Sequence, residues 1–295
     1  MFSISQTSRG FFCLEWLSTE NGPQIITTKH LKINNDFKDK FLLKNIVSQY
    51  ESSINNESNS LSVIVSSDNV LISSIDTCSD EENIKMIKWY ESNLMGADLH
   101  DKYHNYYYPM KSNKNNKFLI VSFPKNIKNN IMKSAIDLKL NLIYLSVDIF
   151  SAAVFVQHQY QKDIKYQYVL WKINKNNKHT IILYKEKLIY AYVVIKKYAK
   201  KCKQIIGIGN NSYVEDLTKL ADNILVHKFS DENIKNIFIY QTKESTEDLR
   251  NILNLGISSI KVLSFNKLIE NRSKNNLKYI NYIENGICFK GLDLL

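Results

Sequence analysis

The residue types that most often carry catalysis occur in this sequence, but their spacing matches no common catalytic motif. None of the six histidines stands in the HExxH pattern that binds zinc on a helix, and no serine stands in a GxSxG turn. Gly207 and Gly209 lack the further glycine and the Lys-Ser/Thr of a phosphate loop, so they predict a plain turn. The acidic run at 80–82 has the form of a helix cap. The sequence therefore predicts no catalytic residue and no metal site.

The cysteines and the charged residues narrow the class of protein. The four cysteines show no CxxC spacing, which excludes a zinc framework and predicts reduced thiols in a cytoplasmic protein. The net charge is +10, yet only three of the 39 basic residues are arginine, and the lysines alternate with asparagine in polar runs. Because nucleic-acid surfaces favour arginine for bidentate contacts, nucleic acid is not the expected partner. We expect no signal peptide and no membrane span.

The remaining elements are organised around the stretch 118–157. An apolar β-branched strand at 118–123 ends at Pro124, and the spacing of the apolar residues after it predicts a helix with one buried face. A second strand is expected at 142–147, and Asp148 is placed to cap the next helix. Strands separated by a helix of this length predict an α/β protein.

The region before this stretch predicts strands first and a helix afterwards. Strands are expected at 11–17 and 24–31 and a short helix at 40–50, and the strands at 61–66 and 70–75 are expected to form a hairpin. A capped helix at 81–94 precedes a strand that contains His104, Tyr106, Tyr107 and Tyr108. These aromatic residues predict either a binding surface or a half-buried edge strand, and both interpretations remain open.

The second half repeats the plan of the first. A hairpin is expected from 166–173 and 179–184, followed by alternating helices and strands and by a closing helix at 277–292. Each half thus begins with hairpins and ends in helix–strand alternation, with a switch between 157 and 168.

This layout resembles the actin-like ATPase superfamily, and in particular its PilM-like members from type IV pilus and type II secretion assembly. The resemblance rests on the Tyr90-Glu91 pair in the helix at 81–94, on the strand, Pro-Lys, helix, strand and acidic residue from Phe118 to Asp148, and on the closing NYIENGICFKGL. It implies an α/β fold, namely an actin-like (ribonuclease-H-like) two-domain fold with an extra small α/β subdomain in the first half. The implied domains are 1–160, with the subdomain at about 79–145, and 161–295, whose helix 277–292 packs back on the first.

The sequence departs from the superfamily at the nucleotide-binding motifs. Alignment places Ser5 and Thr7 where the first hairpin has the Asp and Gly of its phosphate turn, and Lys172 and Asn174 where the second hairpin has them. The glycine-rich turn for adenosine is replaced by Gln241-Thr242-Lys243. Since phosphoryl transfer depends on positioned metal and backbone donors, we expect no nucleotide cofactor and no ATP turnover.

The resemblance implies a non-catalytic scaffold of a type IV pilus or secretion assembly platform. Such a protein lies in the cytoplasm, peripheral to the inner membrane, and binds the cytoplasmic tail of a PilN-like inner-membrane partner in a groove of the first domain. Trp89, Tyr90 and Tyr107 are the candidate lining of that groove, with core packing as the alternative for each. A divergent sugar-kinase-like ATPase and a basic nucleic-acid-associated scaffold are the alternative functions, and self-association is left open.

Overall fold

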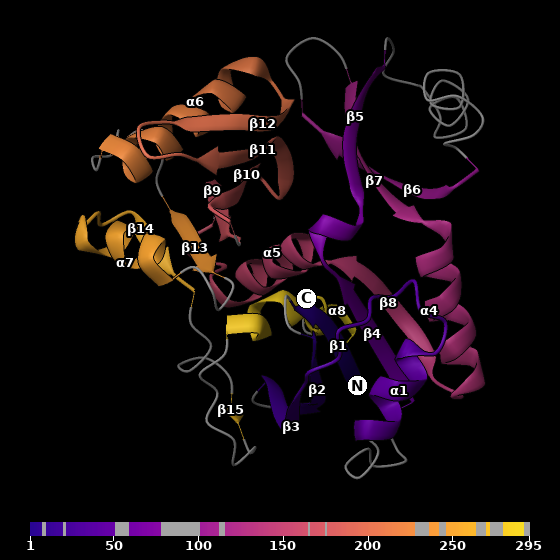
Figure 1. Ribbon diagram of the computed structural model, residues 1–295. Helices are drawn as coiled ribbons and strands as arrows, with labels where there is room; N and C mark the ends of the chain where they lie inside the picture. Colours follow the sequence, from indigo (N-terminus) through magenta and orange to yellow (C-terminus); the bar gives the residue numbers. More distant parts are fainter. Residues whose placement is uncertain are drawn as a thin grey trace. The chain divides into compact units, whose positions relative to one another are not determined.

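The computed structural model describes residues 1–7, 10–19, 22–50, 59–77, 101–111, 116–164, 166–174, 176–227, 236–241, 246–263, 270–271 and 280–291. By their contacts, residues Met1–Val70, Phe123–Gln161 and Ser264–Leu295 form one unit, and Leu71–Ser122 and Lys162–Leu263 form a second (Figure 1). The units interleave along the chain, unlike the continuous halves 1–160 and 161–295 expected from the sequence.

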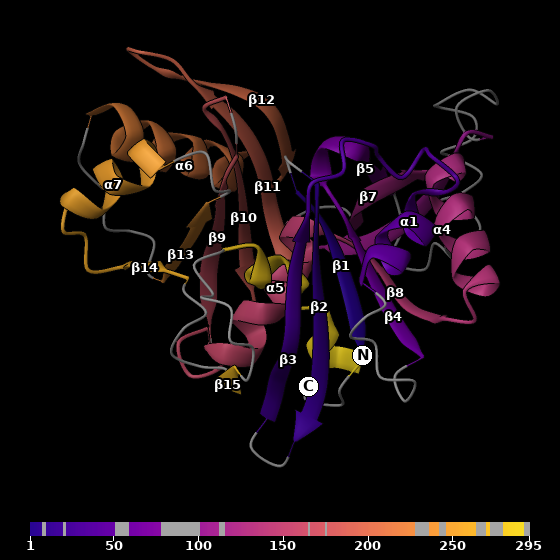
Figure 2. The ribbon, with the colours of Figure 1, turned by 60° about the horizontal axis from the view of Figure 1, so that its bottom comes forward.

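The first unit is built on a six-stranded sheet in the order β15-β3-β2-β1-β4-β8 (Figure 2). Strand β1 lies at its centre, antiparallel to β2 and parallel to β4, and β8 is parallel to β4. The strands are β1 (Phe2–Thr7), β2 (Gly10–Thr19), β3 (Gly22–Leu31), β4 (Ser60–Val65), β8 (Asn141–Val147) and β15 (Glu270–Asn271).

Helices cover both faces of this sheet. Neighbouring residues of β1 point to opposite faces, so each face contributes its own side chains to the packing. Phe2 packs against the ring of Tyr50 in α1 (Leu42–Tyr50), which lies beside α4 (Lys125–Asp137). The opposite face carries the small side chains Ser3 and Ser5. It is covered by the 3₁₀ helix η3 (Ile280–Asn285), which packs together with α5 (Asp148–Gln159) and α8 (Cys288–Gly291).

The closing segment is broken, whereas the sequence predicts one helix over 277–292. Within the described residues 280–291 it consists of η3 and the four-residue α8, separated at Gly286. A Cβ atom on Gly286 would lie 2.5 Å from the backbone nitrogen of Phe155 and 2.6 Å from the carbonyl oxygen of Ser151. The hydroxyl of Ser151 also accepts a hydrogen bond from the backbone N–H of Ile287, at 2.9 Å. The helix is interrupted where the chain must touch the backbone of α5.

The second unit is built on a nine-stranded sheet in the order β14-β13-β9-β10-β11-β6-β7-β5, with β12 paired to β11. Strands β9, β10 and β11 form an antiparallel meander, and β13 and β14 run parallel to β9. The strands are β5 (Leu71–Thr77), β6 (Tyr103–Met110), β7 (Asn116–Pro124), β9 (Gln167–Ile173), β10 (Lys178–Lys185), β11 (Leu188–Lys197), β12 (Cys202–Gly209), β13 (Ile237–Gln241) and β14 (Ile260–Val262).

The two sheets share one strand order. Five strands of each sheet, β3-β2-β1-β4-β8 and β11-β10-β9-β13-β14, both read 3-2-1-4-5 when these five are numbered by their order in the chain, with only the second strand antiparallel to the rest. The repeated plan predicted for the two halves is therefore present as a repeated sheet. This is the arrangement expected of the predicted actin-like fold.

One face of the second sheet carries the core of that unit. Helices α6 (Asn211–Asp222), η2 (Asn223–His227) and α7 (Thr246–Asn254) pack on it through buried aliphatic residues. The turn between β9 and β10 uses Asn176 and Asn177, whose φ angles of 56° and 57° are left-handed. Because asparagine tolerates this conformation well, part of the Lys/Asn-rich sequence has a structural reason.

The hairpin predicted from 61–66 and 70–75 is wrong. Strand β4 pairs with β1 and β8 in the first sheet, while β5 pairs with β7 in the second. The polar residues Ser67–Asn69 form the 3₁₀ turn η1, which leads the chain from one sheet to the other. A short polar turn between two adjacent strands favours a hairpin, but here it connects strands of different sheets. Beyond β7, strand β6 reaches β11 through the pair Met110 and Ile189.

Candidate functional site

Ser5 and Thr7, which align with the phosphate turn of the first hairpin, form hydrogen bonds to other residues of the first unit. Ser5 is fully buried, and its hydroxyl accepts a hydrogen bond from the amide Nδ2 of Asn285, at 3.0 Å. Thr7 donates to the carbonyl oxygen of Gly10 at 3.1 Å, and its hydroxyl lies 3.5 Å from Nε2 of His30. Both aligned side chains therefore contact other strands and η3 of the first unit.

Gly10 is the glycine of this hairpin, and it allows close packing of two strands in the sheet. Its φ angle is +136°, and a Cβ atom there would lie 1.9 Å from the carbonyl oxygen of Leu31. The missing side chain thus lets the backbone of β3 approach β2. A phosphate turn uses a glycine so that backbone amides can approach a ligand, which is a different task.

The second hairpin position is also built into its sheet. Lys172 and Thr180 are directly paired across β9 and β10, on the face opposite to α6 and α7, and both are buried. Asn174 follows Lys172 on this side, and its amide donates to the hydroxyl of Thr180 at 2.9 Å. Of the three residues aligned with the adenosine turn, Gln241 ends β13 and is buried, whereas Thr242 and Lys243 lie outside the described residues. Among the described residues, the amide oxygen of Gln241 has no hydrogen-bond partner.

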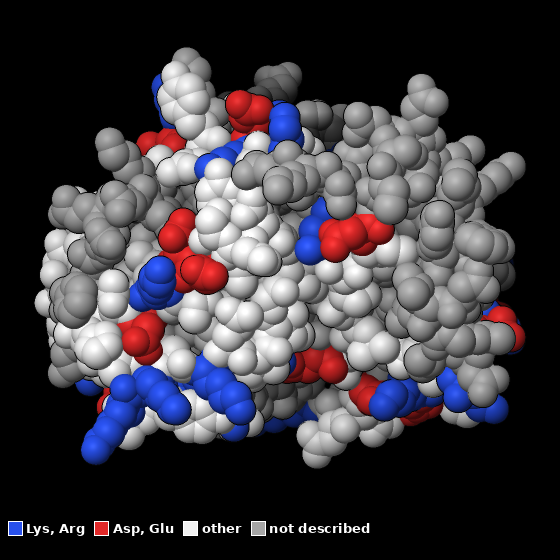
Figure 3. Space-filling model, turned by 90° about the horizontal axis from the view of Figure 1, so that it is seen from above, with Lys and Arg blue, Asp and Glu red and all other residues white. Residues whose placement is uncertain are grey.

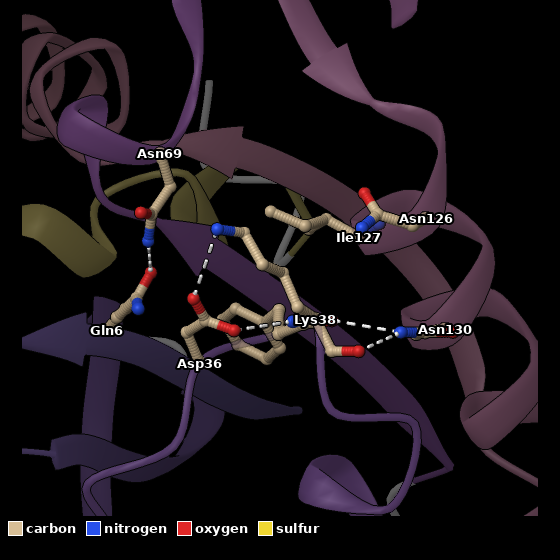
Figure 4. Close-up of polar contacts among 8 residues, drawn as sticks. Gln6, Asp36, Lys38, Asn69, Asn126, Ile127 and Asn130 are labelled. Atoms are coloured by element: carbon tan, nitrogen blue, oxygen red, sulfur yellow. Dashed lines mark hydrogen bonds and ion pairs between the residues drawn. The ribbon is translucent and has the colours of Figure 1, made fainter. Parts of the chain in front are cut away.

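A polar cluster that sequence analysis did not single out lies where the parallel strands β1, β4 and β8 end. Asp148 is buried, and its carboxylate accepts hydrogen bonds from the backbone N–H of Ser67 at 2.9 Å and from that of Ile149 at 2.6 Å. The amide oxygen of Gln6 accepts from Nδ2 of Asn69 at 2.7 Å (Figure 4). Polar residues directly after two predicted strands, at 67–69 and at 148, were the signal for this cluster.

The side chains of this cluster hold neighbouring segments of the chain in place. Asp148 joins the end of β4 to the start of α5, since its two oxygens accept from both segments. In the loop before α1, the carboxylate of Asp36 accepts from the backbone N–H of Lys38 at 2.9 Å, and Nδ2 of Asn130 donates to the carbonyl oxygen of Lys38 at 2.8 Å (Figure 4). These contacts tie the loop before α1 to α4.

A second buried network lies under the turn of the second hairpin. The indole Nε1 of Trp171 donates to Nδ1 of His179 at 3.2 Å. Because an indole can only donate, the proton of the neutral imidazole lies on Nε2, which faces a carboxylate oxygen of Asp248 at 3.5 Å. Nζ of Lys197 lies 2.6 Å from the other oxygen of Asp248. The network joins β9, β10 and β11 to α7.

Burial and charge act on this network in opposite directions. Burial lowers the pKa of His179 below its ordinary value, although Asp248 opposes the change. The hydrogen bond to His179 and the ammonium of Lys197 lower the pKa of Asp248 to about 2. At neutral pH the geometry therefore holds a neutral imidazole beside an ionised carboxylate. Sequence analysis missed the network because its members are far apart in the chain.

Of the three predicted partner-binding residues, the structure describes only Tyr107. Trp89 and Tyr90 lie outside the described residues. Tyr107 packs against the small core of Ile75 and Ile120, while Tyr106 is 36% and Tyr108 39% exposed. Because side chains alternate along a strand, Tyr107 lies on the face of β6 opposite to the other two. The assignment of these residues to a partner stays a prediction.

Among the residues that the structure describes, no group of three or more His, Cys, Asp and Glu side chains is placed to hold a metal ion. Likewise, none of the described helices combines the length and the apolar character needed to cross a bilayer.

Comparisons with known proteins identify the fold. No protein-family model and no curated protein matches the sequence. Among solved structures, a chain described as "PilM-PilN type IV pilus biogenesis complex" matches with a TM-score of 0.66 and 8% identity, over 99% of this chain and 98% of that one. The cytoplasmic domain of EpsL, an inner-membrane component of the type II secretion system of Vibrio cholerae, matches with a TM-score of 0.45 and 7% identity, over 97% and 94%. The predicted fold class is confirmed: this chain has the α/β actin-like fold found in PilM.

Proposed function

We propose that this protein is a non-catalytic, actin-like component of a type IV pilus or secretion assembly platform, which binds the cytoplasmic tail of an inner-membrane partner. One observation carries the proposal, namely the likeness to a PilM-PilN complex chain over nearly the whole length of both chains. In this proposal the protein is cytoplasmic and reaches the inner membrane through its partner.

The non-catalytic part of the proposal is supported by the residues at the aligned nucleotide positions. Ser5 bonds to Asn285 and Asn174 bonds to Thr180, and all four are buried. A phosphate site needs backbone donors and a metal that face the ligand. At these positions the side chains satisfy one another within each unit.

We expect the protein to bind a synthetic peptide that carries the cytoplasmic tail of the PilN-type protein encoded in the same genome. Fluorescence anisotropy with labelled peptide should give saturable binding in the micromolar range. The double variant Trp89→Ala/Tyr90→Ala should bind about tenfold more weakly, because aromatic anchors contribute most of the energy at such interfaces.

The control for this experiment is Tyr198→Ala, which removes an aromatic side chain that is 44% exposed on the second unit. It should leave the affinity within a factor of two. A wild-type protein that binds no peptide at several hundred micromolar argues against the proposed function.

We expect Mg²⁺-ATP to leave the thermal unfolding midpoint unchanged. A ligand that binds only the folded state raises this midpoint, so differential scanning fluorimetry with millimolar Mg²⁺-ATP reports nucleotide binding directly. A rise of several degrees that depends on the ATP concentration favours the divergent ATPase instead.

The charge distribution bears on the nucleic-acid alternative. On the face drawn in Figure 3, Lys and Arg side chains are interspersed with Asp and Glu, and a larger group of basic side chains lies at the lower left. Duplex DNA is contacted by cations that follow its backbone. DNA binding that falls steeply with added salt would support that alternative over the assembly role.

A further inference from the structure

The outward side of α4 presents apolar residues to solvent. Ile136 is 72% exposed and Met132 is 42% exposed, and the two stand one helical turn apart. The inward side of the same helix is buried through Ile127, Ile131 and Ala135. The helix therefore has a second apolar strip, which the described residues of its own unit leave exposed.

Lysines flank this strip. Lys133 and Lys139 are exposed, and Lys139 follows the helix with a φ angle of 55°, where the chain turns toward β8. We call Met132, Lys133, Ile136 and Lys139 the α4 outer face. In both ribbon views α4 lies with one long side turned away from the first sheet (Figures 1 and 2).

Lysines outnumber carboxylates along the segment that carries the α4 outer face. From Lys125 to Val147 the sequence contains a single acidic residue, Asp137. Its carboxylate lies 2.9 Å from Nζ of Lys44 in α1, so it is paired on the side of α4 that faces α1. The surface is thus apolar and cationic at once.

Charge and shape together indicate what covers this surface. The cations are lysines, which act as hydrated point charges and need no fixed partner geometry. The apolar side chains stand on the outward side of a single helix, one turn apart. A helix with apolar residues between lysines is the arrangement that lies in the interface of an anionic bilayer, with its apolar side chains below the headgroups and its ammonium groups at the lipid phosphates.

We propose that the α4 outer face docks directly on an anionic membrane surface. Met132 and Ile136 enter the headgroup region, and Lys133 and Lys139 contact lipid phosphates. The inference adds a lipid contact to the partner contact proposed above and does not require it.

The test is sedimentation of the full chain with vesicles. Vesicles of anionic phosphatidylglycerol mixed with phosphatidylethanolamine should bind the protein, because anionic lipids attract basic surfaces, whereas pure phosphatidylcholine vesicles should not. The triple variant Lys133→Gln/Ile136→Ser/Lys139→Gln should lower the apparent affinity at least tenfold. Raising the salt should weaken the binding of the wild type, because the cations act through screened charges.

The chain offers a matched control at the start of β12, on residues 201–205. The variant Lys201→Gln/Ile205→Ser/Lys203→Gln also removes two exposed lysines and one exposed isoleucine, with Ile205 53% exposed. It should keep the affinity within a factor of two. All changed residues are exposed, and equal thermal midpoints of the three proteins establish that they are folded.

Three results overturn the inference: a wild type that does not bind anionic vesicles, equal binding to both vesicle types, or equal losses in the two triple variants. If the wild type binds acidic, apolar peptides but no vesicles, the surface is a protein interface. The assay contains no partner protein, so its failure leaves the tail-peptide result standing, and the α4 triple variant should bind the tail peptide normally.

Discussion

Replacing Gly286 by alanine should lower the free energy of unfolding by about 3 kcal/mol, because overpacking against backbone atoms cannot be relieved by a rotamer change. The added Cβ would lie 2.5 Å from the nitrogen and 2.6 Å from the Cβ of Phe155, and both belong to the buried helix α5. To relieve these contacts, the closing segment must move away from α5. Urea denaturation of the wild type and the variant measures the effect.

Gly256→Ala is the matched control, since it adds the same methyl group in open space. Gly256 has a φ angle of +64°, and no atom lies within 4 Å of the position of its Cβ. Only the cost of the left-handed backbone remains, about 1 kcal/mol. If both variants lose the same stability, the close contact between Gly286 and α5 does not constrain this fold.

Removing the carboxylate of the buried network by Asp248→Ala should cost about 3 kcal/mol, because it leaves the ammonium of Lys197 without its counter-charge. Lys197 would lose its contact at 2.6 Å, and Nε2 of the neutral His179 would lose its facing oxygen. The exposed pair of Lys44 and Asp137, at 2.9 Å, is the matched control. Asp137→Ala should cost at most about 0.5 kcal/mol, since exposed pairs contribute little. Equal losses in the two variants would contradict the role assigned to burial.

The same network should shape the dependence of stability on pH. The pKa of His179 is lower in the folded than in the unfolded protein, so the unfolded state binds the proton first and stability falls as the pH drops below the ordinary value of 6.5. The pKa of Asp248 is lowered from 3.8 to about 2, so its contribution is present above pH 3.8 and is lost as the pH falls toward 2.

Variants separate these two windows. Asp248→Ala should flatten the pH dependence between about 4 and 2, and His179→Phe should flatten the part below 6.5. Unfolding free energies measured from pH 7.5 to the lowest pH at which unfolding stays reversible test both. An unchanged slope below pH 6.5 in His179→Phe excludes His179 as the titrating group.

Much of the fold could be predicted from local patterns. The strand and helix from Phe118 onward and the turn after β9 follow from periodicity and from residues with strong local preferences. Asp148, expected as the N-cap, is instead the first residue of α5, and the cap position is taken by Val147. The repeated plan of hairpins followed by helix–strand alternation predicted the actin-like fold. Local patterns sufficed because each of these elements buries one face, and the apolar residues of that face recur at a regular spacing within a single short segment.

The pairing of strands could not be predicted from such local patterns. Strands β4 and β5 are joined by a short polar turn, yet they belong to different sheets. The break at Gly286 was also missed, since it depends on the backbone of α5, more than a hundred residues earlier in the chain. Both outcomes are decided by distant neighbours.

The sequence by itself determined the order of elements and the loss of glycines and carboxylates from the aligned phosphate turns. Only the tertiary structure decided what the replacing residues do: Ser5 bonds to Asn285 across 280 positions, and His179 lies beside Asp248 under a turn. The physical reason is that a hydrogen bond requires proximity in space. Which residues come close is set by the packing of whole sheets and helices, which no single stretch of sequence contains.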